Sequence, residues 1–206
     1  VNDFRIKTLL NPMAICLINQ RVVKFNSDLS HSTINHKAWQ VFSQSAVVNF
    51  SDLIVPGEVL EIRTRVPQAD KKWKSMEPLS ITQSSYKMPG VNKGAIVEYR
   101  NRTFTSAPSG TGFIKKPFYF QDSDFFSSFL NSELIVIVPN EVVDRLVFEE
   151  RNKGAKFAVE VKEHETVFKW TAGLKLKQKR ESGIPPVSEV LPNLVIASNR
   201  TDQDLY

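Results

Sequence analysis

The chain has 206 residues, of which 41% are hydrophobic and 24% are charged, and its formal net charge at pH 7 is +5. This composition is that of an ordinary globular protein, and it excludes a disordered, collagen-like or membrane-embedded chain. No apolar run approaches the roughly 20 residues that a membrane-spanning helix needs. Cys16 is the only cysteine, so neither an internal disulfide nor a thiolate zinc site is expected.

The first residue is Val1, and no basic segment followed by an apolar segment forms a signal peptide. We therefore expect a chain that was released from a precursor or cut from a longer one. The lone cysteine favours a reducing compartment.

Apolar runs and alternation predict strands in the first third of the chain. Residues 14–25 predict a strand or a pair of strands, and the polar residues 26–37 predict a connection. Residues 42–50 carry apolar side chains on one parity, and residues 60–66 alternate between apolar and charged ones. Between them, Pro56-Gly57 suits a type II turn, so this region predicts a second β unit.

The middle of the chain continues with short elements. Residues 79–88 and 94–105 predict strands, and residues 113–120 predict a short aromatic strand that a proline interrupts. Residues 123–130 predict one or two helical turns behind a Ser-Asp cap. Residues 134–138 predict a strand that is buried on both faces.

Residues 141–152 predict the longest helix of the chain, with Asn140 as its cap and Gly154 after its end. A Val-Val pair and a Leu-Val-Phe segment within it also allow a strand.

Residues 155–177 place an apolar side chain on almost every second position, which predicts two half-buried antiparallel strands that turn around Glu163 to Glu165. Phe157, Val159 and Val161 lie on the apolar side of the first strand.

Together these elements predict an all-β protein, an antiparallel β-sandwich of jelly-roll type with one or two short helices. We expect residues 1–206 to form a single β-rich domain. Within it, residues 181–206 form a proline-spaced C-terminal arm, whose final apolar patch at 194–197 packs on the body or on a neighbour.

Two basic clusters are candidate nucleic-acid contacts. The modest positive charge favours an acidic partner, because cations spaced along one strand face suit phosphates and an exposed tryptophan can stack on a base. Solvated lysines that discourage strand edges from pairing have the same pattern. The candidate residues are Lys175, Lys177, Lys179, Arg180, Lys71, Lys72, Trp73 and Lys74.

The strongest enzymatic alternative is a metal-dependent nuclease. Glu160-Val161-Lys162 has the acid-x-Lys spacing in which a carboxylate holds Mg²⁺ and a lysine helps to activate water. Asp144 is the only well-spaced upstream candidate for a second acid. Three histidines, His31, His36 and His164, show no ligand spacing, so we expect surface histidines, no metal site and no cofactor.

No phosphate-binding glycine loop and no Gly-x-Ser-x-Gly elbow occurs in the sequence. The leading hypothesis is therefore a non-enzymatic structural or assembly protein, of the viral capsid type that encloses nucleic acid. Its partners would be further copies or sister subunits together with nucleic acid, in a virion or the host cytoplasm. The alternative is a β-rich nucleic-acid-binding protein such as a movement protein, a silencing suppressor or a single-strand binder.

Overall fold

The computed structural model describes residues 13–108, 117–120, 127–174 and 191–198. Strands make up most of these residues, and two short helical segments accompany them. The expected all-β class with one or two short helices is therefore confirmed. The described strands divide nine, three and three among three sheets, which differs from the eight-stranded double sheet of a jelly roll.

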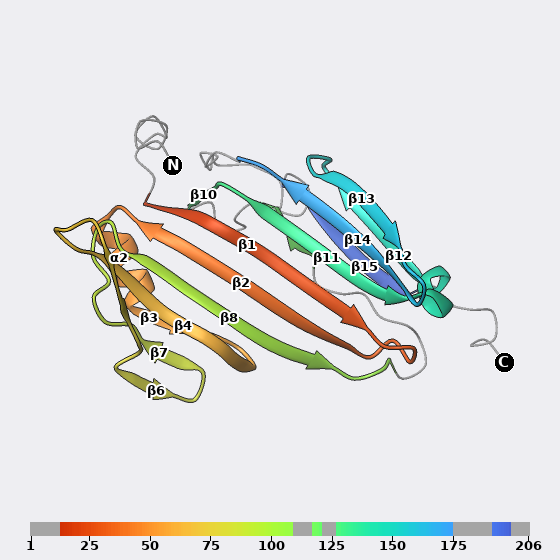
Figure 1. Ribbon diagram of the computed structural model, residues 1–206, viewed down its shortest axis with the longest axis horizontal. Helices are drawn as coiled ribbons and strands as arrows, with labels where there is room; N and C mark the ends of the chain where they lie inside the picture. Colours follow the sequence, from red (N-terminus) through yellow and green to blue (C-terminus); the bar gives the residue numbers. More distant parts are fainter. Residues whose placement is uncertain (1–12, 109–116, 121–126, 175–190, 199–206) are drawn as a thin grey trace, which may run out of the picture.

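The nine-stranded sheet forms the body of the molecule, in the order β13-β14-β11-β1-β2-β8-β4-β5 with β10 beside β1 (Figure 1). Near its centre, β1 runs antiparallel to β2 and parallel to β10 and β11. The other pairs of this sheet are antiparallel. The strands are β1 (Ala14–Phe25), β2 (His31–Val41), β4 (Glu58–Pro67), β5 (Trp73–Met76), β8 (Ile96–Thr105), β10 (Ser127–Phe129), β11 (Ser132–Pro139), β13 (Lys156–Val161) and β14 (Glu165–Ala172).

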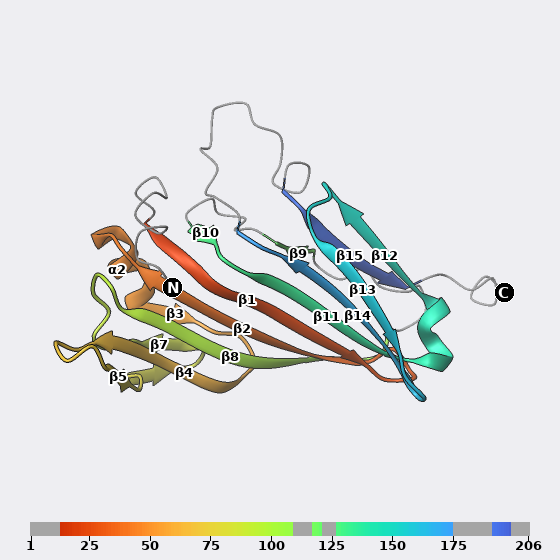
Figure 2. The ribbon, with the colours of Figure 1, turned by 45° about the horizontal axis from the view of Figure 1, so that its top comes forward.

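Two three-stranded sheets lie at opposite ends of the large sheet (Figure 1 and Figure 2). One has the order β12-β15-β9 and the other the order β3-β7-β6. Their strands are β12 (Leu146–Arg151), β15 (Asn193–Ser198), β9 (Phe118–Tyr119), β3 (Asp52–Ile54), β7 (Ser85–Lys87) and β6 (Ser80–Thr82). The helices are α2 (Gln44–Ser51) and the 3-10 helix η1 (Asn140–Arg145).

The apolar core consists of two clusters, one under each small sheet. The first joins β1, β11 and β14 to the β12-β15-β9 sheet through buried residues such as Val23, Trp170 and Leu194. The second joins β2 and β8 to α2 and β3, through Val97 and Leu53 among others. Fully burying one such side chain stabilises a fold by about 1.5–3 kcal/mol, so each small sheet is held by several such contributions.

Both clusters lie on the same face of the large sheet. Residues of equal parity on a strand point to one face. On β2, His31 packs against Phe25 of the first cluster, and Val41 belongs to the second. We call this side the covered face and the opposite side the open face, because neither cluster of the described chain contains a residue from that other side.

The predicted hairpin is confirmed, since β13 and β14 pair antiparallel and turn between residues 162 and 164. The strand predicted at 134–138 is also present as part of β11, but it is not buried on both sides. Its covered-face residues are buried, while Ile135 and Ile137 on the open face are half-buried.

The connection predicted at 26–37 is wrong for its second half, because β2 begins at His31. This strand is polar in sequence, yet it lies between β1 and β8 and pairs with both. Its polar side chains find partners there, and Asn35 Oδ1 accepts a hydrogen bond from Arg21 Nε at 2.9 Å. Main-chain pairing on both sides outweighs a composition that is typical of turns.

Residues 44–50 of the segment 42–50, which was predicted as a strand, belong to helix α2 instead. Ser43 caps the helix, with its side-chain oxygen accepting from the Ala46 amide at 3.1 Å. Residues 46 and 50 then lie one turn apart, and the Phe50 ring packs at 5.2 Å from the Trp39 ring. A spacing of four residues fits a helix as well as a strand, so parity alone misled the prediction.

Residues 141–152 form η1 and then β12, so the predicted helix is wrong and the strand alternative is right for 146–151. Asn140 does not cap this element through its side chain. Instead its Nδ2 donates to Lys162 O at 2.9 Å and to Glu163 O at 3.1 Å, which ties η1 to the β13–β14 turn.

The other predicted elements are recovered in part. The strands predicted at 79–88 and 94–105 correspond to β6 with β7 and to β8. Residues 127–129 form β10 rather than helix, while 121–126 lie outside the described residues. Of the predicted aromatic strand at 113–120, residues 113–116 lie outside the described residues, and Phe118–Tyr119 form β9. In the predicted C-terminal arm, β15 packs into a small sheet, with Leu194 and Ile196 in the first core cluster. The single-domain organisation stays a prediction.

The Pro56-Gly57 turn yields the first testable prediction. Gly57 has φ +75°, and a Cβ there would lie 2.3 Å from Arg102 O. We expect Gly57→Ala to lower the free energy of unfolding by about 2 kcal/mol or more, measured by urea denaturation with tryptophan fluorescence. Gly173→Ala is the matched control, because nothing lies within 4 Å of its added Cβ. Equal stability of the two variants would contradict the strain assigned to Gly57.

Candidate functional site

A row of polar side chains crosses the open face of the large sheet. The strand register aligns its members directly, from β14 through β11, β1, β2 and β8 to β4. Five strand spacings of about 4.8 Å give this row a length of about 24 Å. Its members are Thr171, Glu133, Gln20, His36, Arg100 and Glu61.

At the β14 end of this row, Glu133 accepts hydrogen bonds from Gln20 Nε2 and from Lys169 Nζ. Burial raises the pKa of Glu133, but the hydrogen bonds from Lys169 and Gln20 outweigh this and leave the pKa below its usual value. This end of the row is therefore an ion pair with a bridging amide.

The most buried charge of the open face is Glu98 on β8, whose side chain is 5% exposed. His36 Nε2 lies 2.8 Å from its Oε1, and Arg63 Nε lies 3.0 Å from its Oε2. Arg65 also donates to Oε2. Because an ionised carboxylate only accepts hydrogen bonds, the histidine Nε2 is the donor here. Three strands, β2, β8 and β4, thus meet at one carboxylate, which we call the Glu98 cluster.

Electrostatics keep Glu98 ionised. Burial raises its pKa, while the hydrogen bonds from His36 and Arg63 and the positive charges of Arg65 and Arg63 lower it, with a net shift below the usual glutamate value. A general base works best with a pKa near the working pH, so this shift moves Glu98 away from that role. The Glu98 cluster therefore has the chemistry of a structural junction between strands.

The predicted surface position of the histidines holds for His164, whose side chain is 87% exposed. It is wrong for His31, which is 3% exposed and packs on Phe25. Cys16 is buried on the covered face, with its Sγ donating to Ile18 O at 3.1 Å. His36 lies on the open face, so the sheet separates the thiol from this imidazole. Among the described residues there is no group of three or more metal-ligating side chains.

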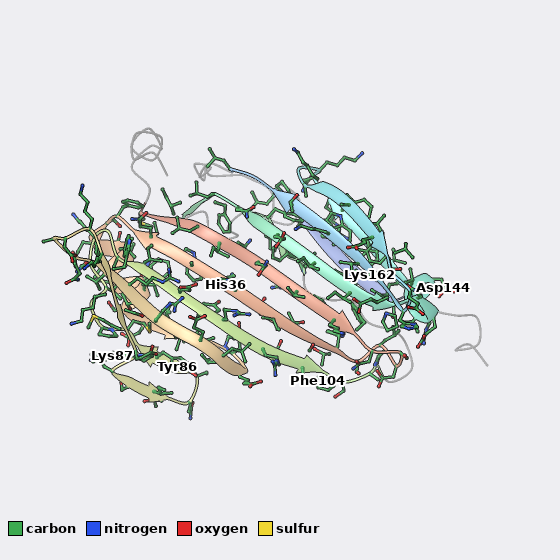
Figure 3. All side chains as sticks on the ribbon, viewed as in Figure 1. His36, Tyr86, Lys87, Phe104, Asp144 and Lys162 are labelled. Carbon is green, nitrogen blue, oxygen red and sulfur yellow. The ribbon has the colours of Figure 1, made fainter. Side chains whose placement is uncertain are left out.

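The two acids of the predicted nuclease site lie on different elements, and a nuclease activity stays a prediction. Glu160 lies on the open face of β13, whereas Asp144 lies on η1 at the end of the molecule where Lys162 also lies (Figure 3). Lys162 Nζ is 3.8 Å from Glu165 Oε1.

The predicted nucleic-acid residues fall into two groups. Lys175, Lys177, Lys179 and Arg180 lie outside the described residues. The other group is exposed at the β4–β5 hairpin, where Trp73 is 47% exposed. There, Lys72 Nζ lies 3.4 Å from Asp70 Oδ2. This second group is Lys71, Lys72, Trp73 and Lys74.

Sequence reasoning missed a surface on β13. Its covered-face residues were expected to be half-buried, yet Phe157, Val159 and Val161 are 54%, 53% and 73% exposed. The reason is the width of the sheet. The strand β12 covers β14 through the Phe148 ring, which lies 5.3 Å from Trp170, and β13 extends one strand further. We call these three residues of β13 the edge strip.

No protein-family model matches this chain, and no curated protein matches it in sequence. Among solved structures, it is similar to a putative protease from Parabacteroides distasonis, with a TM-score of 0.72, 14% identity, and coverage of 93% of this chain and 41% of that one. A second match is aminopeptidase A of Legionella pneumophila in complex with aspartic acid, with a TM-score of 0.41, 10% identity, and coverage of 94% of this chain and 22% of that one. The chain therefore spans less than half the length of either protein. The first likeness shows the fold alone.

Within the described residues, no helix has the length and apolar character needed to cross a membrane.

The Glu98 cluster gives the second testable prediction. We expect Glu98→Gln to lower the free energy of unfolding at pH 7 by about 2 kcal/mol, because the neutral amide no longer pairs with the guanidinium groups of Arg63 and Arg65. Those two groups are partly exposed and regain water, which limits the loss. Glu58→Gln is the control, because its carboxylate is 61% exposed.

The pH dependence of that difference has a defined sign. The folded-state pKa of Glu98 is lowered, so the unfolded chain binds more protons as the pH falls below the usual glutamate value of about 4.3. The stability that Glu98 contributes is present above that pH and is lost as the pH falls through the folded-state pKa. The gap between wild type and Glu98→Gln in chemical denaturation should shrink on acidification, and a constant gap would contradict the ionised cluster.

Proposed function

We propose that this chain is a non-enzymatic assembly domain, a β platform that joins protein surfaces. The observation that carries the proposal is the edge strip, where three successive covered-face residues of β13 are more than half exposed. Monomeric proteins usually scatter exposed apolar residues singly, and contiguous ones mark binding surfaces.

The covered face shows how unusual this strip is. On the neighbouring strand, Trp170 is 3% exposed and belongs to the core, whereas its partner in register, Phe157, is 54% exposed. The two rings are in contact, with centroids 4.9 Å apart. The core thus continues into the strip without a cover, and a partner surface would complete it.

A non-enzymatic role fits the chemistry of the described residues. Glu98, the most buried acid of the open face, is held ionised between an imidazole and two guanidinium groups, and Cys16 lies across the sheet from His36. The putative protease has this fold over only part of its length. That likeness shows the fold alone, and we do not assign proteolysis to this chain.

The narrower expectation of a virus-shell subunit in a virion stays a prediction. The strand division of nine, three and three does not add support to it.

Self-association in solution tests the assembly function. We expect sedimentation velocity from about 1 to 300 µM to show a concentration-dependent increase in mass, since a small interface gives weak affinity. Val159→Asp should reduce the association about tenfold or more, because it places a charge in the edge strip. Val48→Asp on α2 is the control, at a residue that is 66% exposed. A chain that stays monomeric over this range would contradict the assembly function.

Nucleic-acid binding is a second proposal, supported by the exposed Trp73 among the lysines of the β4–β5 hairpin. Cations and a stackable ring at one loop suit single strands. We expect changing Lys71, Lys72 and Lys74 together to alanine to weaken binding of a labelled single-stranded oligonucleotide and to reduce its salt dependence by about two to three contacts. Trp73→Ala should weaken binding with little change in that slope. An unaltered affinity and slope in the lysine variant would exclude this loop.

A further inference from the structure

We propose that two copies of this chain join edge to edge at β13. The two strands run antiparallel around a twofold axis that passes beside Ala158, and the two large sheets become one. This inference rests on the assembly function, and it names the site, the partner and the register.

In the described chain, β13 is the last strand of the nine-stranded sheet and pairs on one side only, with β14. Its outer edge therefore presents backbone donors and acceptors that a further strand can satisfy. The Lys162 amide donates to Glu165 O at 2.8 Å within the turn. Asn140 bonds this turn from η1, and Thr166 Oγ1 donates to Asn140 Oδ1 at 2.8 Å. The hairpin is thus held in place before a partner arrives.

The sequence of β13 is complementary to itself in one antiparallel register. With Ala158 opposite Ala158, Lys156 of each copy lies opposite Glu160 of the other on the open face. Opposite charges at directly paired positions stabilise a sheet, and this register forms two such pairs. On the covered face, Phe157 of each copy lies opposite Val159 of the other, an aromatic and β-branched pair of the kind that sheets favour.

Neighbouring registers lack this match. With Val159 opposite itself, Lys156 lies opposite Lys162, which places like charges together twice. With Glu160 opposite itself, two carboxylates meet on the axis. A register that is shifted by one residue, with Ala158 of one copy opposite Val159 of the other, would put the apolar strip of one copy on the open face of the other. Charge and side-chain direction therefore select the Ala158 register.

The same contact between copies also adds apolar packing on the covered face. Phe157 already packs on Trp170 at 4.9 Å and stacks on Phe168 at 6.4 Å between ring centroids. In the joined sheet, Val159 of the partner copy would lie beside Phe157 and extend this aromatic cluster across the axis. The contact is short, so the dimer is expected to be weak, with a dissociation constant on the order of tens of micromolar.

Charge reversal tests the register. Lys156→Glu alone and Glu160→Lys alone each turn both attractive pairs into repulsive ones, and each variant should dimerise at least about tenfold more weakly than wild type at low salt. An equimolar mixture of the two variants restores both pairs in the heterodimer, so its affinity should return to within about threefold of wild type. Both positions are exposed on the open face of the strand, so the variants keep the fold, which circular dichroism and the melting temperature verify.

Lys162→Glu is the matched control for the register. In the Ala158 register it lies opposite Gly154 and should leave the dimer unchanged, whereas in the Val159 register it would strengthen the dimer by adding two attractive pairs. A strengthened dimer therefore overturns the proposed register.

Cross-linking gives an independent measurement. Directly opposed antiparallel residues have Cα atoms about 4.5–5.5 Å apart, a distance that suits a disulfide. The Ala158→Cys variant should therefore form a covalent dimer under mild oxidation. Wild type and Lys162→Cys should not, because Cys16 is buried and the two copies of residue 162 would lie far from the axis.

The outcomes separate this inference from the assembly function. If wild type associates, but the charge variants, their mixture and Ala158→Cys behave as wild type does, the edge-to-edge dimer is wrong and the assembly function stands. If wild type does not associate at any concentration, both are wrong.

Discussion

The small sheets cover one face of the large sheet, and they do so incompletely. Each strand that lies under them must place apolar side chains towards them and water-compatible ones on the open face, which produces the alternation of β4, β8 and β11. The cover stops over β14, where Phe148 meets Trp170. Residues that follow the same alternation one strand further out, on β13, keep their apolar character without the burial that it usually brings. The core and the candidate interface are thus one continuous apolar surface. They differ only in that a small sheet covers the core and does not reach β13.

On the open face, the same geometry brings charges together. The guanidinium groups of Arg63 and Arg65 project from β4 towards β8, and Glu98 is the anion between them. Leaving a carboxylate buried without partners would cost several kcal/mol, whereas pairing it fixes the relative position of β2, β8 and β4. The lowered pKa of Glu98 reports that the partners outweigh the burial. This explains how a strand as polar as β2 has a defined place in the sheet.

Elements with local signals were predictable from the sequence. The β13–β14 hairpin follows from alternation on both sides of a short turn, and Pro56-Gly57 predicted a turn in which Gly57 indeed has φ +75°.

The elements that sequence reasoning missed depend on distant partners. The polar strand β2 is stabilised by pairing with β1 and β8, and α2 shares its apolar spacing with a strand. The Glu98 cluster draws on three strands, so no local pattern shows it, although the alternation of Glu98, Arg100 and Arg102 marked one charged face. The exposure of Phe157 depends on how far β12 reaches across the large sheet, and the sequence of β13 carries no information about that.

The parallel pairing of β1 with β11 has a consequence for how the protein is made. Gln20 and Glu133 are neighbours in the sheet but lie 113 residues apart in the chain. At ribosomal rates of about 5–20 residues per second, the β11 side of β1 waits roughly 6 to 23 s for its partner. Pairing of such long range also slows folding, because a large loop must close before its contacts form. The central strand of the finished sheet is therefore, for that interval, an unpaired edge on the nascent chain, and its protection during synthesis is a separate requirement from its stability afterwards.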